Sequence, residues 1–94
     1  MSISQVSAHA QARMQQRGIT PDLLRLLADY GATTHDHQGA ELRYFNKSSR
    51  QRLLSNEGRH VYRAVESKLD VYAVVALDGC VVTVGHRDRR IPRY

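Results

Sequence analysis

The fold is decided by one stretch of the sequence, which reads LDVYAVVALDGCVVTVGHRDRRIPRY over residues 69–94. Two apolar runs flank Asp78-Gly79, a dipeptide that favours the positive φ angles of a type I′ turn. The stretch therefore predicts a tight β-hairpin with a two-residue turn at Asp78-Gly79. Its second strand continues into a basic cluster at residues 86–90, so the hairpin would present an imidazole and several guanidinium groups from a rigid support.

Counting outward from this turn predicts which side chains share a face of the hairpin. The register places His86 at the end of the core-facing side and Arg87 on the opposite side. Because the first strand is apolar on both faces, we expect it to lie in the centre of the sheet. The expected pairs are Leu77 with Cys80, Val75 with Val82, Ala73 with Val84, Val71 with His86, and Asp70 with Arg87.

The charge of the chain indicates an anionic partner. The formal net charge is +5 at pH 7, and Lys47 and Lys68 are the only lysines among the 14 basic residues. The others are arginines, whose planar guanidinium groups bind phosphate through two parallel hydrogen bonds. This composition is typical of proteins that bind RNA, the ribosome or an acidic partner protein, although a GC-rich genome enriches arginine in the same way. A chain of 94 residues is short enough to form a single domain, 1–94.

The sequence gives little indication of a metal site or a disulfide bond. Cys80 is the only cysteine, which excludes an intrachain disulfide and a zinc site built from thiolates. His35 and His37 would share one face of a strand, but Asp36 points the other way and no further metal ligand is near. We therefore expect no metal and no cofactor. The N-terminus is too polar for a signal peptide and no long apolar run follows, so we expect a cytoplasmic protein without a membrane segment.

Residues 7–17, SAHAQARMQQR, predict a first helix, with Ser4 or Ser7 as its N-cap and Gly18 as its stop. Its basic residues border the apolar stripe rather than lying on the far side, as they do on an ordinary surface helix. They either line a groove between helix and sheet, or lay their apolar stems on the core with their charged ends in water. The apolar stripe is Val6, Ala10 and Met14, and the row beside it is His9, Arg13 and Arg17.

The remaining elements are short. Thr20-Pro21-Asp22 begins a second helix that ends at Gly31, and its apolar spacing predicts a purely structural role. Two strands follow, at 33–37 and 41–46, the second with Leu42, Tyr44 and Phe45 available for packing. A third helix begins at Ser48 or Ser49 and ends near Asn56 or Gly58, and residues 59–68 favour a helix over a strand.

Two histidines and several arginines could meet at one rim if the first helix packs on the core face of the hairpin. Such a set can cleave RNA without a metal: a base takes the proton of a ribose 2′-hydroxyl, and an acid protonates the leaving 5′-oxygen. Histidine suits both roles near neutral pH, and arginine holds the phosphate. We expect His9 and His86 to exchange protons, with Tyr72 or Tyr94 as possible substitutes for one histidine. The expected phosphate-binding residues are Arg13, Arg17, Arg87 and Arg90.

A structural interpretation of the same residues stays open. His86 would then only end a strand, Arg87 would pair with Asp70 in a surface ion pair of little energetic weight, and the basic tail would serve solubility.

Both ends of the chain resemble a widespread bacterial domain family of unknown function. The resemblance rests on His9-Ala10, Arg13-Met14 and Arg17-Gly18-Ile19, followed by a Thr-Pro-Asp helix start, and on the closing strand Val81 to Val84 with its basic end. That family is similar to toxins of the RelE/ParE type and to the barnase- and colicin-like RNases. The resemblance implies N-terminal helices on a curved antiparallel sheet, and ribonuclease or toxin activity with a cognate antitoxin for some relatives. It carries candidate roles to His9, Arg13, Arg17, His86 and Arg87.

We therefore expect an α+β, RelE-like fold with N-terminal helices on one face of a three- to four-stranded antiparallel sheet. The expected function is that of a metal-independent endoribonuclease of toxin type, which cleaves RNA by 2′-hydroxyl attack. The alternative is a non-catalytic basic module that binds RNA, the ribosome or an acidic partner such as an antitoxin protein.

Overall fold

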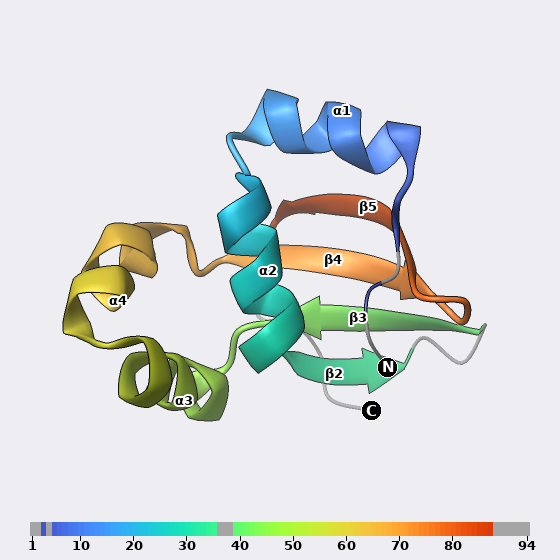
Figure 1. The fold of residues 1–94 in the computed structure, drawn as a ribbon. Coiled ribbons are helices and arrows are strands. Elements are labelled where there is room, and N and C mark those ends of the chain that lie inside the picture. Colours follow the sequence, from blue (N-terminus) through green and yellow to red (C-terminus); the bar gives the residue numbers. More distant parts are fainter. Residues whose placement is uncertain (1–2, 4, 36–38, 88–94) are drawn as a thin grey trace.

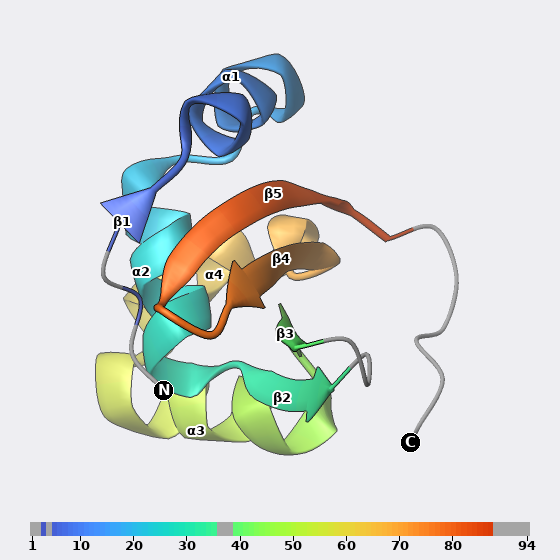
Figure 2. The same cartoon turned by 90° about the vertical axis from the view of Figure 1, so that its right-hand side faces the viewer.

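A computed structural model describes residues 3, 5–35 and 39–87 of the chain. The described residues form an α+β domain in which helices α1 and α2 cover one face of a five-stranded sheet of order β1-β5-β4-β3-β2 (Figure 1). Seen from the side, no helix of the described chain covers the opposite face, which we call the open face (Figure 2). The elements are β1 (Gln5–Val6), α1 (Ala8–Arg17), α2 (Pro21–Tyr30), β2 (Ala32–His35), β3 (Ala40–Tyr44), α3 (Lys47–Glu57), α4 (Arg59–Val65), the 3-10 helix η1 (Glu66–Lys68), β4 (Val71–Ala76) and β5 (Cys80–His86).

The sheet has one strand more than the three or four expected, and it is mixed rather than antiparallel. The additional strand is β1, in which Gln5 and Val6 pair in parallel with Cys80 and Val81 at the edge of β5. Two residues are too few to show the alternation by which a strand is predicted, which explains the difference. The other neighbours pair antiparallel, and β4 lies between β3 and β5 as its apolar character predicted.

The hairpin register is confirmed at the end that carries His86. Val71 pairs with His86 and Ala73 with Val84, and the backbone N–H of Arg87 donates to the carbonyl of Asp70 at 2.8 Å. His86 therefore follows the buried face of the sheet and Arg87 the open face, because side chains alternate along a strand.

The expected register is wrong at the turn. The N–H of Gly79 donates to the carbonyl of Ala76 at 2.9 Å, so residues 77–79 separate the strands instead of Asp78-Gly79 alone, and Gly79 has a φ of 88°. This longer loop pairs Val75 with Val81 and not with Val82, and a β-bulge at Val82 restores the expected register from Val74 and Thr83 onward. Val81 is consequently buried and Val82 exposed, the reverse of the expectation, because one inserted residue exchanges the two faces.

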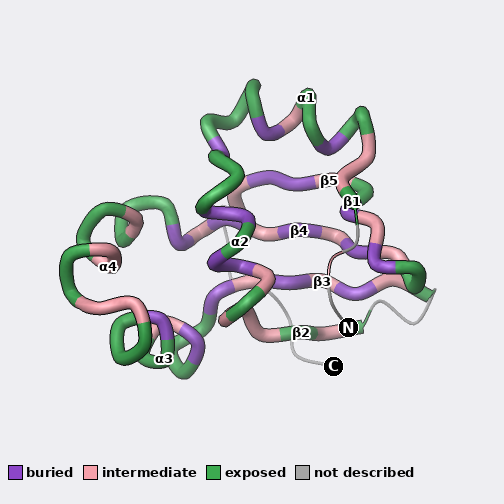
Figure 3. The backbone as a smooth tube through the Cα atoms, in the orientation of Figure 1, coloured by how far each residue is buried: buried purple, intermediate pink, exposed green. Residues whose placement is uncertain are grey.

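Local capping chemistry sets the ends of the first two helices as predicted. Ser7 caps α1 by accepting from the N–H of Ala10 at 3.0 Å, and Gly18 ends it with a φ of 66°. Thr20 caps α2 in the same way. Figure 3 shows buried residues along the sheet and on the sides of both helices that face it. These include Ala10 and Met14 of α1 and four leucines of α2, Leu23, Leu24, Leu26 and Leu27.

Strand β3 presents a charged pair to the core. Glu41 and Arg43 are buried beneath α2, together with Phe45 just after the strand. Leu42 and Tyr44, which the sequence offered for packing, lie on the open face instead. Alternation predicted which residues share a face of this strand, but not which face the helices cover.

Helices α3 and α4 extend from one end of the sheet (Figure 1). Asn46 caps α3 and forms a capping box with Ser49, so the helix begins before the predicted Ser48 or Ser49. Residues 59–65 form α4 and residues 66–68 form η1, which confirms the helical prediction for this segment. Among the described residues, no helix is long and apolar enough to cross a membrane.

Candidate functional site

His86 lies at the end of β5, where both nitrogens of its ring contact acceptors. Its Nδ1 is 2.8 Å from Oδ1 of Asp70, and its Nε2 is 2.9 Å from the backbone carbonyl of Arg17 at the end of α1. The hydrogen bond to the Arg17 carbonyl raises the pKa of His86, and the bond to Asp70 raises it further. A proton transfer to or from RNA would require this ring to leave one of these partners.

The two histidines of the expected catalytic pair lie towards opposite ends of α1. His86 contacts the last residue of the helix, whereas His9 is its second residue and is exposed. Eight residues at about 1.5 Å each separate His9 from Arg17 by roughly 12 Å along the helix axis. The fold therefore brings His86 to the C-terminal end of α1 and leaves His9 at the N-terminal end, beyond the reach of a shared hydrogen bond.

The candidate arginines also separate. Arg13 is half-buried and the side chain of Arg17 is exposed, both on α1, while Arg87 lies across the sheet on the open face. Arg90 lies outside the described residues, as do His37 and Tyr94. Asp70 contacts His86 at 2.8 Å, so the pairing expected between the side chains of Arg87 and Asp70 is replaced by an Asp70–His86 pair.

Arg87 is held in place on the open face. Its guanidinium carbon lies 5.5 Å from the centre of the Tyr44 ring, and one Nη donates to the carbonyl of Phe45 at 2.6 Å. Burial lowers the pKa of Arg87, and the nearby charge of Arg50 lowers it further. Because arginine keeps its proton in proteins, this lowering reflects burial and the charge of Arg50, whose own guanidinium donates to the carbonyl of Leu69 at 3.5 Å.

Two tyrosines extend this region along the sheet. Tyr44 and Tyr72 are paired neighbours on β3 and β4, so both side chains emerge on the open face. The Tyr72 ring lies over Gly85, where an added Cβ would meet its hydroxyl oxygen at 2.9 Å and its Cζ at 3.1 Å. We call the set Tyr44, Tyr72, Arg50 and Arg87 the tyrosine–arginine face.

Sequence reasoning singled out Arg87 and Tyr72 but missed Arg50 and Tyr44. The missing information is the β3–β4 pairing, which joins segments nearly 30 residues apart and leaves no local pattern. The alternation of Leu42 and Tyr44 would have supplied a signal only if the covered face of the sheet had been known.

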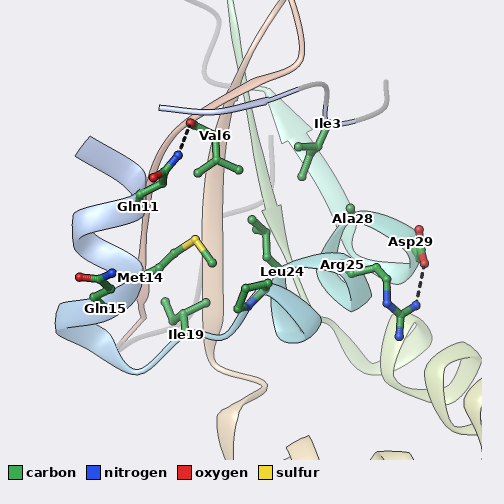
Figure 4. Close-up of a pocket in the computed structure, with 11 residues that line it drawn as sticks. Ile3, Val6, Gln11, Met14, Gln15, Ile19, Leu24, Arg25, Ala28 and Asp29 are labelled. Carbon is green, nitrogen blue, oxygen red and sulfur yellow. Dashed lines mark hydrogen bonds and ion pairs between the residues drawn. The ribbon is translucent and has the colours of Figure 1, made fainter. Parts of the chain in front are cut away.

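A groove of about 700 Å³ lies on the helical side of the molecule, between α1, α2 and the segment before α1 (Figure 4). Apolar side chains line its floor, and the Gln11 side chain, which donates to the carbonyl of Val6 at 3.2 Å, and the Arg25–Asp29 ion pair lie at its edges. Within the described part of the chain, no three histidine, cysteine or acidic residues gather as a metal site would require. The floor residues include Val6, Met14, Ile19 and Leu24.

In comparisons with known proteins, no family model, no curated protein and no solved structure matches this chain.

Proposed function

We propose that the chain binds RNA on its tyrosine–arginine face. One observation carries the proposal: the Arg87 guanidinium is held over the Tyr44 ring, beside the paired Tyr72, on a face that no described helix covers, and the charge of Arg50 acts on it. Guanidinium groups bind phosphates, and aromatic rings on a sheet stack with unpaired bases. Double-stranded RNA is recognised mainly by shape, so this combination favours single-stranded RNA as the ligand.

Arg87 is suited to a fixed phosphate contact. It is braced by the Tyr44 ring and by the Phe45 carbonyl, so little side-chain freedom remains to be lost on binding. One of its five N–H donors is used in the bond to Phe45. An anion bound at Arg87 is also attracted by the charge of Arg50, which favours phosphate over a neutral ligand.

Cleavage of RNA by a metal-independent endoribonuclease of toxin type is our second candidate. The observation that favours it is the raised pKa of His86, which precedes Arg87 in the chain and keeps a proton available for a leaving group. We rank it second because both ring nitrogens of His86 are already hydrogen-bonded and His9 lies towards the far end of α1. An acidic partner protein such as an antitoxin would compete with RNA for the same arginines.

Fluorescence anisotropy with a labelled single-stranded RNA tests the first proposal. We expect Arg87→Gln to weaken RNA binding about tenfold or more. We also expect the slope of log binding constant against log salt concentration to become shallower by about one unit, as the loss of one phosphate contact requires. We expect Tyr72→Leu to cost about 1–3 kcal/mol of binding free energy. Arg59→Gln is the matched control, because it removes one exposed positive charge from α4, away from the sheet. If Arg59→Gln and Arg87→Gln lower the RNA affinity equally, binding depends only on the total positive charge, and the proposed site is contradicted.

The second candidate is tested by incubating the protein with RNA in the presence of EDTA. Cleavage that both His86→Ala and His9→Ala abolish would support the two-histidine mechanism. If both variants still cleave RNA, the assignment of His9 and His86 as catalytic residues is refuted. If the protein binds RNA without cleaving it, the non-catalytic RNA-binding function is favoured.

A further inference from the structure

Helix α1 is fastened to the sheet at its two ends. At its beginning, the N–H of Ser7 donates to the carbonyl of Val81 at 3.0 Å and the Ser7 hydroxyl to the carbonyl of Val82 at 3.3 Å. Between the ends, the helix buries only two of its side chains, Ala10 and Met14. At its end, the Arg17 carbonyl contacts Nε2 of His86 at 2.9 Å. A helix with so few buried side chains depends strongly on these terminal contacts.

Only a charged imidazole can make both contacts of the His86 ring at the same time. Both partners of the ring, the Arg17 carbonyl and the Asp70 carboxylate, are acceptors. A neutral imidazole has one N–H and can serve only one of them, whereas the imidazolium ion donates to both. The Arg17 carbonyl is also among the last carbonyls of α1, which have no partner within the helix and carry the negative end of its dipole. A positive charge at this place is therefore favourable for two reasons.

The charges around the ring agree with this geometry. The pKa of His86 is raised first by the hydrogen bond to the Arg17 carbonyl and then by the bond to Asp70. Burial of the ring and the guanidinium of Arg17 act in the opposite direction without cancelling the increase. Within the described chain, Asp70 and Arg17 are the titratable groups whose charges act on the ring. The Asp70 side chain is 48% exposed, so salt screens its share, whereas the bond to the backbone carbonyl persists.

We propose that His86 is a pH-sensitive clasp: when protonated it joins the C-terminal end of α1 to Asp70 through both ring nitrogens, and when deprotonated it keeps only one of these hydrogen bonds and holds the helix end less tightly. The stabilisation is fully present below the ordinary histidine pKa of 6.5 and is lost as the pH rises through the higher pKa of the folded protein. Because α1 forms one wall of the groove of Figure 4, the clasp also fixes the width of that groove. This inference is independent of RNA binding.

Nitrogen-15 NMR of the histidine rings measures the state of the clasp directly. At pH 6 we expect the two ring nitrogens of His86 to show the similar shifts of an imidazolium ion, with a titration midpoint above the ordinary histidine pKa of 6.5. Amide exchange at Gly18 and Ile19, whose N–H groups bond to the carbonyl of Met14, reports on the end of the helix. Protection is corrected for the intrinsic exchange rate at each pH. We expect the protection factors of the Gly18 and Ile19 amides to fall as the pH rises, by roughly tenfold for each unit by which the folded protein raises the pKa of His86.

Two variants separate the clasp from a general effect of pH. His9→Gln removes an exposed histidine of the same helix and should keep the full pH response, whereas Asp70→Asn should lower the His86 midpoint. His86→Gln should remove the response. If that variant does not fold, the wild-type titration and Asp70→Asn still decide the question. A neutral His86 ring at pH 6, or protection at Gly18 that does not change while His86 titrates, would overturn the proposal.

Discussion

We expect Glu41→Gln to be among the most destabilising conservative substitutions in this protein. The Glu41 carboxylate lies on the buried face of β3, with its Oε2 at 3.9 Å from Nε of Arg43. The two side chains are only 8% and 10% exposed, and Arg43 also donates to the carbonyl of Ala28 at 2.8 Å. Replacing the carboxylate by a neutral amide leaves less compensation for a positive charge that solvent hardly reaches.

The expected magnitude follows from distance and burial. Two unit charges about 4 Å apart interact by about 4 kcal/mol at an effective dielectric constant near 20. Removing one partner of a buried pair costs about 3–5 kcal/mol in measured cases. Small domains have total stabilities of about 5–15 kcal/mol, so this loss is a large part of the whole. The melting temperature of a domain of this size should fall by roughly 15–30 °C.

Urea denaturation of a double-mutant cycle is the assay. Glu41→Gln and Arg43→Met are measured singly and together, and the double variant should lose less than the sum of the single losses, because neither charge is then buried alone. Asp29→Asn is the matched control, since the Arg25–Asp29 pair on α2 is 52% and 53% exposed and should contribute less than about 1 kcal/mol. Similar losses for Glu41→Gln and Asp29→Asn, with additive effects in the cycle, would refute the reasoning.

Two further predictions concern a cap and a close contact. Ser7→Ala should cost about 1 kcal/mol in urea denaturation, because it removes the acceptor for the Ala10 N–H, whereas exposed Ser55→Ala in α3 should change little; equal effects would contradict the capping role. Gly85→Ala should displace the Tyr72 ring at a cost of about 1–3 kcal/mol and change the near-ultraviolet circular dichroism of the tyrosines; an unchanged spectrum at full stability would count against this contact.

The sequence alone determined the features that depend on neighbours in the chain. Ser7 and Thr20 begin α1 and α2, because each side chain accepts from a backbone N–H three residues away. Gly18 ends α1, because glycine adopts the positive φ of a helix end without strain. The pairing of Val71 with His86 was predicted by counting from a two-residue turn, and it holds because the bulge at Val82 offsets the extra residue of the loop. Alternation along the strand then places His86 and Arg87 on opposite faces as expected.

Only the tertiary structure decided which face of β3 became the core. The pattern of β3 is compatible with burying either Leu42 and Tyr44 or Glu41 and Arg43, and the position of α2 selected the charged pair. The bulge at Val82 and the parallel pairing of β1 were likewise not predicted, because neither has a local sequence signature.

The candidate site shows the same division. The sequence identified His86 and Arg87 as the chemically notable end of the hairpin, but the partners of both residues come from distant segments. His86 contacts a backbone carbonyl of α1, and Arg87 lies over a ring of β3. Every residue type has the same backbone carbonyl, so the amino acid at position 17 gives no indication of the contact with His86. The second depends on strand pairing, which brings the Tyr44 ring beneath Arg87 only in the folded sheet.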